Sequence, residues 1–260
     1  MKEGVADDLR QSYVVMKNEM TKFFRGKRML IFLGLAIAVF LLITVLPYLV
    51  GESLSKDPEQ IILNYISFVS LLVLLAATLF ASVTIVSEYE ERTALILFTR
   101  PIKKSSVFLG KFSASLVIGV AFVIMYYIFV ALISLIVARG IDPALAKSLL
   151  LAIMYAIGAF GVAILISSIM KKASTSTIIT FVILLMILPI ISMALSISVD
   201  VWWMLDQASN AISYILPGNK SALDLMQIPV PSVFKESLVM VAWGLVSSVA
   251  AYILFKRREF

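Results

Sequence analysis

Residues 148–170 read SLLLAIMYAIGAFGVAILISSIM, and this stretch contains no charged side chain. A helix needs about 20 mostly apolar residues to cross the hydrocarbon core of a bilayer. Backbone amides in lipid must find their hydrogen-bond partners within the segment, so an apolar run of this length predicts a transmembrane helix. The strands of a membrane barrel are shorter and alternate with polar positions, which this stretch does not do.

Five further apolar runs of similar length lie on either side of it. Together they predict an all-α membrane protein with six transmembrane helices, at about 30–51, 61–87, 107–138, 148–170, 175–199 and 236–255. The stretch before the first run is too long and too polar for the n-region of a signal peptide, so the first run is interpreted as a retained helix. We expect residues 1–260 to form a single transmembrane domain.

The composition excludes several classes of protein. Apolar residues make up 61% of the chain and charged residues 15%, against about 45–50% and about 25% in soluble domains. A cytosolic enzyme, a secreted domain and a disordered protein are therefore ruled out. The chain has no cysteine and no histidine, which removes thiolate chemistry and the commonest general base and metal ligand. We expect no catalytic residue, no metal site and no cofactor in this chain.

The basic residues predict how the chain is oriented. Seventeen of the 22 Lys and Arg residues fall in residues 1–28, in the connections after the second and fourth runs, and in the tail after residue 255. The other five lie in the remaining connections. Lys and Arg are enriched in cytoplasmic loops. We therefore expect both termini, and the connection between the second and third spans, to be cytoplasmic.

The membrane-spanning runs offer no source of energy for transport. Ionisable residues, which ion-coupled transporters place inside the membrane, are missing near the centre of every run. The Gly-x-x-x-x-Gly-Lys-[Ser/Thr] loop that cradles nucleotide phosphates is also absent, and serines in the runs have no neighbouring base. We assign those serines to helix packing or backbone hydrogen bonding. An intramembrane enzyme is disfavoured.

Small residues and one proline mark packing positions in the later runs. Gly158 and Gly161 share one helix face, and Gly244 shares another with Ser248. Such positions let two helices approach closely. Pro189 lies in the middle of the fifth run, where it is expected to kink the helix. Plain bundle packing and a gating hinge both remain open.

The N-terminal segment has the pattern of an amphipathic helix that lies along the inner leaflet. Its apolar face is predicted to hold Tyr13, Met16, Met20, Phe23 and Phe24, and its polar face includes Lys17 and Arg25. A simple topology anchor and a docking surface for a cytoplasmic partner are both compatible with this pattern.

The connection between the second and third spans is the most informative segment. Residues 87–111 read SEYEERTALILFTRPIKKSSVFLGK. Acids at the start of a short helix suit its N-terminal dipole, and Pro101 is expected to end the helix by forcing Arg100 into an extended conformation. A short helix that is acidic at one end and apolar further on suits a groove on another protein, although a loop along the membrane surface fits the pattern equally well.

The same residues resemble the signature of ABC-2-type transporter permeases. In that family the second span ends in Glu-x-Glu-x-Gly-Thr, followed by an apolar turn, Arg-Pro-[Ile/Val] and a Gly-Lys that enters the third span. This chain has the matching residues in the same order, except that Arg92 stands where the family commonly has glycine: Glu88, Glu90 or Glu91, Thr93, Arg100-Pro101-Ile102 and Gly110-Lys111. With six spans, it is most similar to the permeases used in nitrous-oxide reductase maturation.

The resemblance implies a mechanism that supplies the missing energy. Two permease subunits would pair as a homodimer, and each would dock a separate ABC ATPase subunit that holds ATP and Mg. The segment 88–101 would be the coupling helix in the ATPase groove, with the docking residues Glu88, Glu90, Glu91, Arg92, Thr93, Arg100 and Pro101.

The outer connection, residues 200–234, is rich in interfacial aromatic residues. In the family, this region resembles short re-entrant helices that cap the pathway outside. The candidate cap residues are Trp202, Trp203, Tyr214 and Pro217. Trp and Tyr also favour the membrane interface by themselves, so a simple interfacial anchor is equally compatible. Asn219 begins an N-glycosylation sequon.

Taken together, the sequence predicts a multi-pass permease subunit of an ABC transporter in the plasma membrane. The family implies export as the usual direction. A membrane scaffold that anchors a cytoplasmic partner without transport is the alternative. The spans are apolar with scattered hydroxyls, which favours an amphiphilic or lipid-like substrate over a bare ion. No nucleic-acid partner is expected.

Overall fold

The structure, a computed structural model, describes residues 5–49, 51, 55–90, 102–217, 219 and 232–258. These residues form helices and no strand. The elements are α1 (Val5–Arg25), α2 (Lys27–Leu49), α3 (Pro58–Ile66), α4 (Val69–Ala76), η1 (Ala77–Ala81), α5 (Ser82–Thr84), α6 (Val86–Glu90), α8 (Lys104–Ala138), α9 (Ala144–Ile169), α10 (Ala173–Val182), η2 (Ile183–Ile187), α11 (Leu188–Ser196), α12 (Leu205–Tyr214) and α14 (Val233–Arg257).

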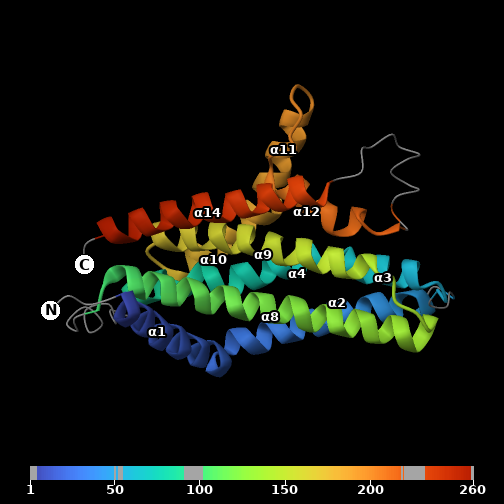
Figure 1. The fold of residues 1–260 in the computed structure, drawn as a ribbon, viewed down its shortest axis with the longest axis horizontal. Coiled ribbons are helices and arrows are strands. Elements are labelled where there is room, and N and C mark those ends of the chain that lie inside the picture. Colours follow the sequence, from blue (N-terminus) through green and yellow to red (C-terminus); the bar gives the residue numbers. More distant parts are fainter. Residues whose placement is uncertain are drawn as a thin grey trace.

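Six of the helical segments are long and apolar enough to cross a membrane, which confirms the predicted fold class. They are α2, the broken helix α3 to α6, α8, α9, the combined α10 to α11, and α14. The two ends of the chain lie at the same end of the bundle, as an even number of spans requires (Figure 1). We call this the terminal end.

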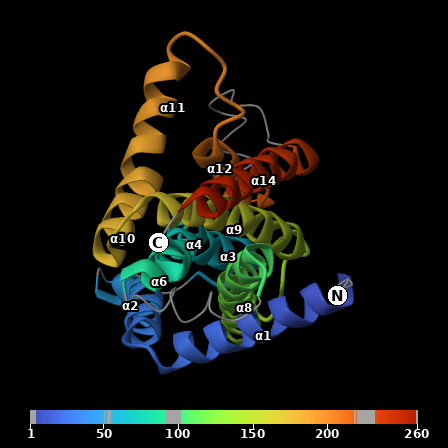
Figure 2. The same cartoon turned by 90° about the vertical axis from the view of Figure 1, so that its left-hand side faces the viewer.

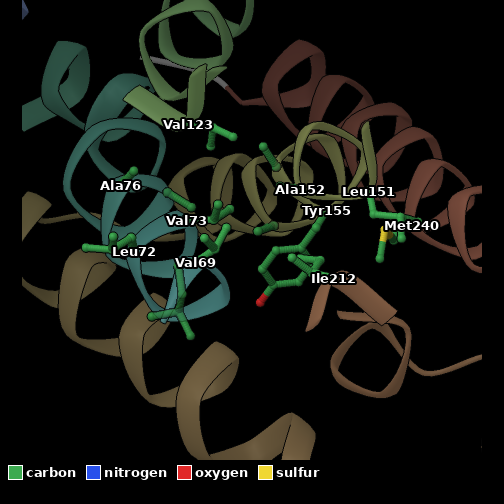
Figure 3. Close-up of a cluster of buried hydrophobic side chains, with 14 of the residues drawn as sticks. Val69, Leu72, Val73, Ala76, Val123, Leu151, Ala152, Tyr155, Ile212 and Met240 are labelled. Atoms are coloured by element: carbon green, nitrogen blue, oxygen red, sulfur yellow. The ribbon is translucent and has the colours of Figure 1, made fainter. Parts of the chain in front are cut away.

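The second span forms the centre of the molecule, and the first lies at its edge. In its most apolar stretch, 78% of the residues from Pro58 to Glu90 are buried, against 11% for α2. Figure 3 shows the core around it, where Val69 and Val73 of α4 face Tyr155 of α9. The second span is therefore surrounded by protein on most sides, whereas most of α2 is not buried within this chain.

Glycines set the close contact between α9 and α14, as predicted. A Cβ at Gly161 would lie 2.7 Å from the carbonyl oxygen of Gly244, and a Cβ at Gly158 would lie 2.9 Å from that of Met240. A Cβ at Gly244 would in turn lie 2.7 Å from the carbonyl oxygen of Ile157. Since backbone cannot move aside as a side chain can, these positions exclude any larger residue.

The second span contains an irregular stretch, and neighbouring serines compensate for it. The π-helical turn η1 precedes the short helices α5 and α6. The backbone amides of Ile85 and Val86 each donate to Oγ of Ser167 at 3.1 Å, and Ser176 donates to the carbonyl of Ser82 at 2.5 Å. Irregular backbone at membrane depth is tolerated where such partners exist. Of the two roles expected for serines in the runs, packing or backbone hydrogen bonding, Ser167 thus has the second.

Replacing Ser167 with alanine is expected to destabilise the protein by about 1–3 kcal/mol, because two buried amides lose their acceptor. Its neighbour Ser168 is the matched control, since its hydroxyl donates only to the carbonyl of Ile164 in its own helix at 2.9 Å. Thermal unfolding of the purified variants in one detergent compares them. Equal midpoints for Ser167→Ala and Ser168→Ala would contradict the bridging role of Ser167.

The fifth span differs from its neighbours in direction. Figures 1 and 2 both show α10 to α11 running obliquely out of the bundle. The π-helical turn η2 ends two residues before Pro189, which is the second residue of α11. A proline removes one helical hydrogen bond and crowds the preceding turn, and a π turn at that place changes the register of the carbonyls it would meet. The sequence predicts a kink at Pro189, and the structure has a π turn just before this residue.

Candidate coupling site

The predicted docking segment is described only at its start. Glu88 and Glu90 lie in α6, while Glu91, Arg92, Thr93, Arg100 and Pro101 lie outside the described residues. The side chains around the described part therefore define how the segment is attached to the bundle.

Glu88 binds inward to a lysine. Nζ of Lys111 lies 2.8 Å from a carboxylate oxygen of Glu88 in α6 and 2.7 Å from one of Glu19 in α1. The side chains of Lys111, Glu19 and Glu88 are only 3%, 8% and 15% exposed. We call these three residues the Lys111 cluster. Two carboxylates share one ammonium, and the cluster joins three helices at the terminal end.

The local sequence brings Glu19 to Lys111. Glu19 lies on the same face of α1 as Val15 and Phe23, and this face packs along α8. A Cβ at Gly110 would lie 2.5 Å from the carbonyl oxygen of Ser12, so only glycine permits this approach. The Gly110-Lys111 pair of the signature therefore has two structural roles. Gly110 allows the close approach of α1, and Lys111 forms an ion pair with Glu19 of α1.

Tyr89 contacts the C-terminal part of the chain. The guanidinium of Arg258 lies 4.0 Å from the centre of the Tyr89 ring, within the range of a cation–π contact. The same guanidinium donates to the carbonyl oxygens of Ser168 and Met170 at 3.2 and 2.8 Å. Because these carbonyls lie at the end of α9, a cation there also suits the helix dipole.

Glu90 contacts a third part of the bundle. Its carboxylate accepts a hydrogen bond of 2.7 Å from the amide of Ala173, the first residue of α10. Carboxylates at this position satisfy an otherwise unpaired amide and suit the helix dipole. Three consecutive residues thus contact three parts of the bundle. Glu88 contacts Lys111 of α8, which also binds Glu19 of α1. Tyr89 contacts Arg258, which also binds the end of α9, and Glu90 contacts α10.

The chain is attached again directly after the segment. Nζ of Lys103 lies 2.8 Å from a carboxylate oxygen of Asp8 in α1. Lys104 donates to the carbonyl oxygens of Lys256 and Arg258 at 3.4 Å. Residues 91–101 are therefore bracketed by contacts to α1, α8, α10 and the end of α14.

The N-terminal helix is amphipathic, and its apolar residues divide between two faces. Phe23 is buried at 6% exposure, with Met16 and Met20 packed beside it. Tyr13 and Phe24 are about 60% exposed, at 61% and 59%. Lys17 and Arg25 are exposed as well. One face thus packs against protein and the other is exposed, so the single apolar face expected from the sequence is divided between the two. The position of this helix along the inner leaflet stays a prediction.

The outer connection folds back onto the bundle. Helix α12 packs against α9 and α14, with Ile212 and Leu216 buried. Ser148 of α9 donates to the carbonyl of Ile212 at 2.6 Å. The four candidate cap residues lie at the rim of this contact: Trp202 and Trp203 are exposed, and Tyr214 and Pro217 are half-buried. Lys235 lies 4.3 Å from the ring centre of Trp202.

Sequence reasoning missed Glu19, Tyr89 and Arg258 as members of this site. The position of Glu19 could have been recognised from the sequence, because it lies four residues from both Val15 and Phe23 on a helix face that is otherwise apolar. An acid in that position predicts a buried basic partner. No sequence pattern indicates the role of Arg258, since its partners are backbone carbonyls at the end of α9.

Six helices long and apolar enough to cross a membrane, joined at the terminal end by a buried cluster of charges, define a multi-pass membrane protein. The sequence profile described as ABC-2 family transporter protein matches residues 13–260. The chain therefore belongs to this family, and it is a membrane permease subunit of an ABC transporter in the plasma membrane. Membership implies association with an ABC ATPase subunit. No curated protein sequence matches the chain. The closer resemblance to nitrous-oxide-reductase-maturation permeases stays a prediction.

Proposed function

We propose that residues 88–101 receive the movement of a partner ATPase and pass it to the membrane spans. The observation that carries this proposal is that Glu88, Tyr89 and Glu90 contact three different parts of the bundle. A displacement of α6 would pull on α1, α10 and the tail of α14 at once. Packed elements transmit small shifts as rigid bodies because interiors are dense.

In this proposal, Glu88 and Glu90 attach the coupling segment to the bundle. Residues 91–101, which follow them, contact the surface of the ATPase. Glu88 is 15% exposed in its ion pair with Lys111, and Glu90 caps α10. The candidates for direct docking are then Glu91, Arg92, Thr93, Arg100 and Pro101. ATP and Mg would be held by the ATPase, not by this chain.

We further propose that two copies of this chain form the permease. Two copies would give each of two ATPase subunits its own docking segment. The oblique fifth span and α2 carry many exposed apolar side chains, including Ile190, Met193 and Ile197, which a second copy or lipid can cover. The mass of the detergent-solubilised complex distinguishes one copy from two.

Export of an amphiphilic substrate is the proposed activity. Among the described residues, the side chains buried in the spans are mainly apolar, with hydroxyls such as those of Tyr127 and Ser148 between them. Such surroundings favour a molecule with a large apolar part. Stimulation of ATP hydrolysis by a small ion alone would contradict this substrate class.

Reversing the charges of the segment is expected to release the ATPase. In the variant Glu91→Lys with Arg92→Glu, we expect the amount of co-purifying P-loop ATPase to fall at least about tenfold, since like charges would face each other at the interface. Lys56→Glu is the control, because Lys56 is exposed in the connection between the first two spans. Affinity purification from native membranes, followed by mass spectrometry, measures the ATPase.

Two other outcomes carry information. If the ATPase is retained in the double variant, the docking role of this segment is wrong. If an ATPase is bound but its hydrolysis does not respond to any membrane-soluble compound, the scaffold alternative gains support.

A further inference from the structure

A lateral groove lies between α2 and its neighbours α4 and α8 along part of the length of α2. It has a volume of about 210 Å³ and lies between α2, α4 and α8, with Phe32 and Phe40 on one side and Val69 and Val73 at its back. Figure 3 shows the wall that α4 contributes. Ile37 and Phe129, at its mouth, are 57% and 49% exposed. We call this cavity the α2–α8 groove, and it opens toward the bilayer.

The groove offers no hydrogen bond to an occupant. Its lining is hydrocarbon except for Tyr126, and the hydroxyl of Tyr126 donates to the backbone carbonyl of Tyr65 at 2.8 Å. Water needs two to four polar partners to occupy a cavity stably. A polar solute in the groove would lose its hydrogen bonds to water and gain none from the protein. The occupant must therefore be apolar over the whole length of the groove.

The size of the groove excludes a helix from another chain. An α-helix with its side chains is about 10–12 Å across, which a cavity of 210 Å³ cannot hold for more than a few residues. A cavity of about 150 Å³ accommodates a benzene molecule. A single hydrocarbon chain therefore fits the space between α2 and α8, and the surrounding bilayer supplies such chains.

The charge at one end of the groove indicates which lipid is bound. Residues 20–51 contain no acidic residue. They contain four basic residues: Lys22, Arg25, Lys27 and Arg28. They surround the corner between α1 and α2. From Lys27 to Phe40, α2 rises about 20 Å, which is comparable to the thickness of one leaflet of a ~30 Å hydrocarbon core.

We propose that the α2–α8 groove binds one acyl chain of an anionic phospholipid, whose phosphate lies at the basic corner. Long basic side chains reach the headgroup region while their stems cover apolar surface. This inference does not depend on the docking of an ATPase. Bound lipid would fill the space between α2 and the core and hold the first span in place.

A photoactivatable lipid tests the proposal. The full-length chain is reconstituted in phosphatidylcholine nanodiscs that contain a trace of phosphatidylglycerol with a diazirine in the distal half of one acyl chain. We expect labelling to concentrate on peptides with residues 32–40 and 122–129. Phosphatidylcholine that carries the same diazirine is expected to label them less.

Two substitutions on α2 form a matched pair. Ala36 lines the groove, and Ala38 points away from it and is exposed. In Ala36→Phe we expect labelling to fall about tenfold, which corresponds to the loss of about two buried methylene groups, while Ala38→Phe keeps it. Leu33→Trp fills the same groove from a second position. Monodisperse elution of each variant shows that it is folded.

Three results would overturn the proposal. Labelling that is unchanged in both Ala36→Phe and Leu33→Trp excludes the groove as the site. Cross-links between two copies through the groove residues would show that side chains of a second copy occupy it. Equal labelling by phosphatidylglycerol and phosphatidylcholine would exclude the assignment of the headgroup to the basic corner.

Discussion

Replacing Lys111 with methionine is expected to destabilise the protein by about 3–5 kcal/mol, because the buried carboxylate of Glu19 would lose its counter-charge and that of Glu88 would lose one of its contacts. All three side chains of the Lys111 cluster are nearly or fully removed from solvent. Such a loss corresponds to a decrease of roughly 10 °C in the unfolding midpoint. Thermal unfolding of the purified protein in a mild detergent measures it.

Lys103→Met is the matched control. Lys103 also pairs with a carboxylate, that of Asp8, but their side chains are 44% and 33% exposed. Exposed pairs contribute about 0–1 kcal/mol, so this variant is expected to unfold close to the native midpoint. Adding Glu19→Gln to Lys111→Met should recover part of the loss, since one unpaired charge is removed. If both lysine variants behave alike, the cluster does not stabilise the terminal end.

Placing a side chain at Gly161 is expected to have an effect of similar size. The Cβ of an alanine there would lie 2.7 Å from the carbonyl oxygen of Gly244 and 2.8 Å from its Cα. Neither atom can move without shifting α14. Overpacking typically costs about 1–3 kcal/mol when side chains can adjust, and we expect Gly161→Val to exceed this range. The yield of monodisperse protein and its unfolding midpoint measure the effect.

Gly34 provides the comparison for this variant. It also lies within an apolar helix, but among the described residues no atom lies within 4 Å of its Cβ position. Alanine is a better helix former than glycine by roughly 0.5–1 kcal/mol, so Gly34→Ala should be neutral or stabilising while Gly161→Ala is destabilising. If both substitutions changed the unfolding midpoint in the same direction, the packing of α9 against α14 would not require a glycine at position 161.

The spans could be predicted from the sequence because they depend on local properties. The length and apolarity of a run such as 148–170 are sufficient to indicate a membrane helix. The close approach at Gly161 was also predictable, because small residues at regular spacing have few other uses in lipid.

The contacts at the terminal end could not be predicted in the same way. Glu19 and Lys111 are 92 residues apart in the sequence, and nothing local indicates that their helices meet. The backbone groups of Ser82, Ile85 and Val86 after η1 find their partners in Ser167 and Ser176 of other spans. The length and apolarity of residues 175–199 likewise do not indicate the oblique direction of α10 to α11. These features require the tertiary arrangement.

The three tryptophans of the chain make it a selective spectroscopic reporter. The indole NH of Trp243 donates to the carbonyl of Trp203 at 2.8 Å, and Trp202 adjoins Trp203 beside Lys235. All three fluorophores therefore sample one neighbourhood, where α12 meets α14. Neither α1 nor the Lys111 cluster contains a tryptophan, so tryptophan emission does not report on them directly. A change in tryptophan emission when nucleotide is added to the assembled transporter would thus report a rearrangement near α12, away from the Lys111 cluster, without any attached dye.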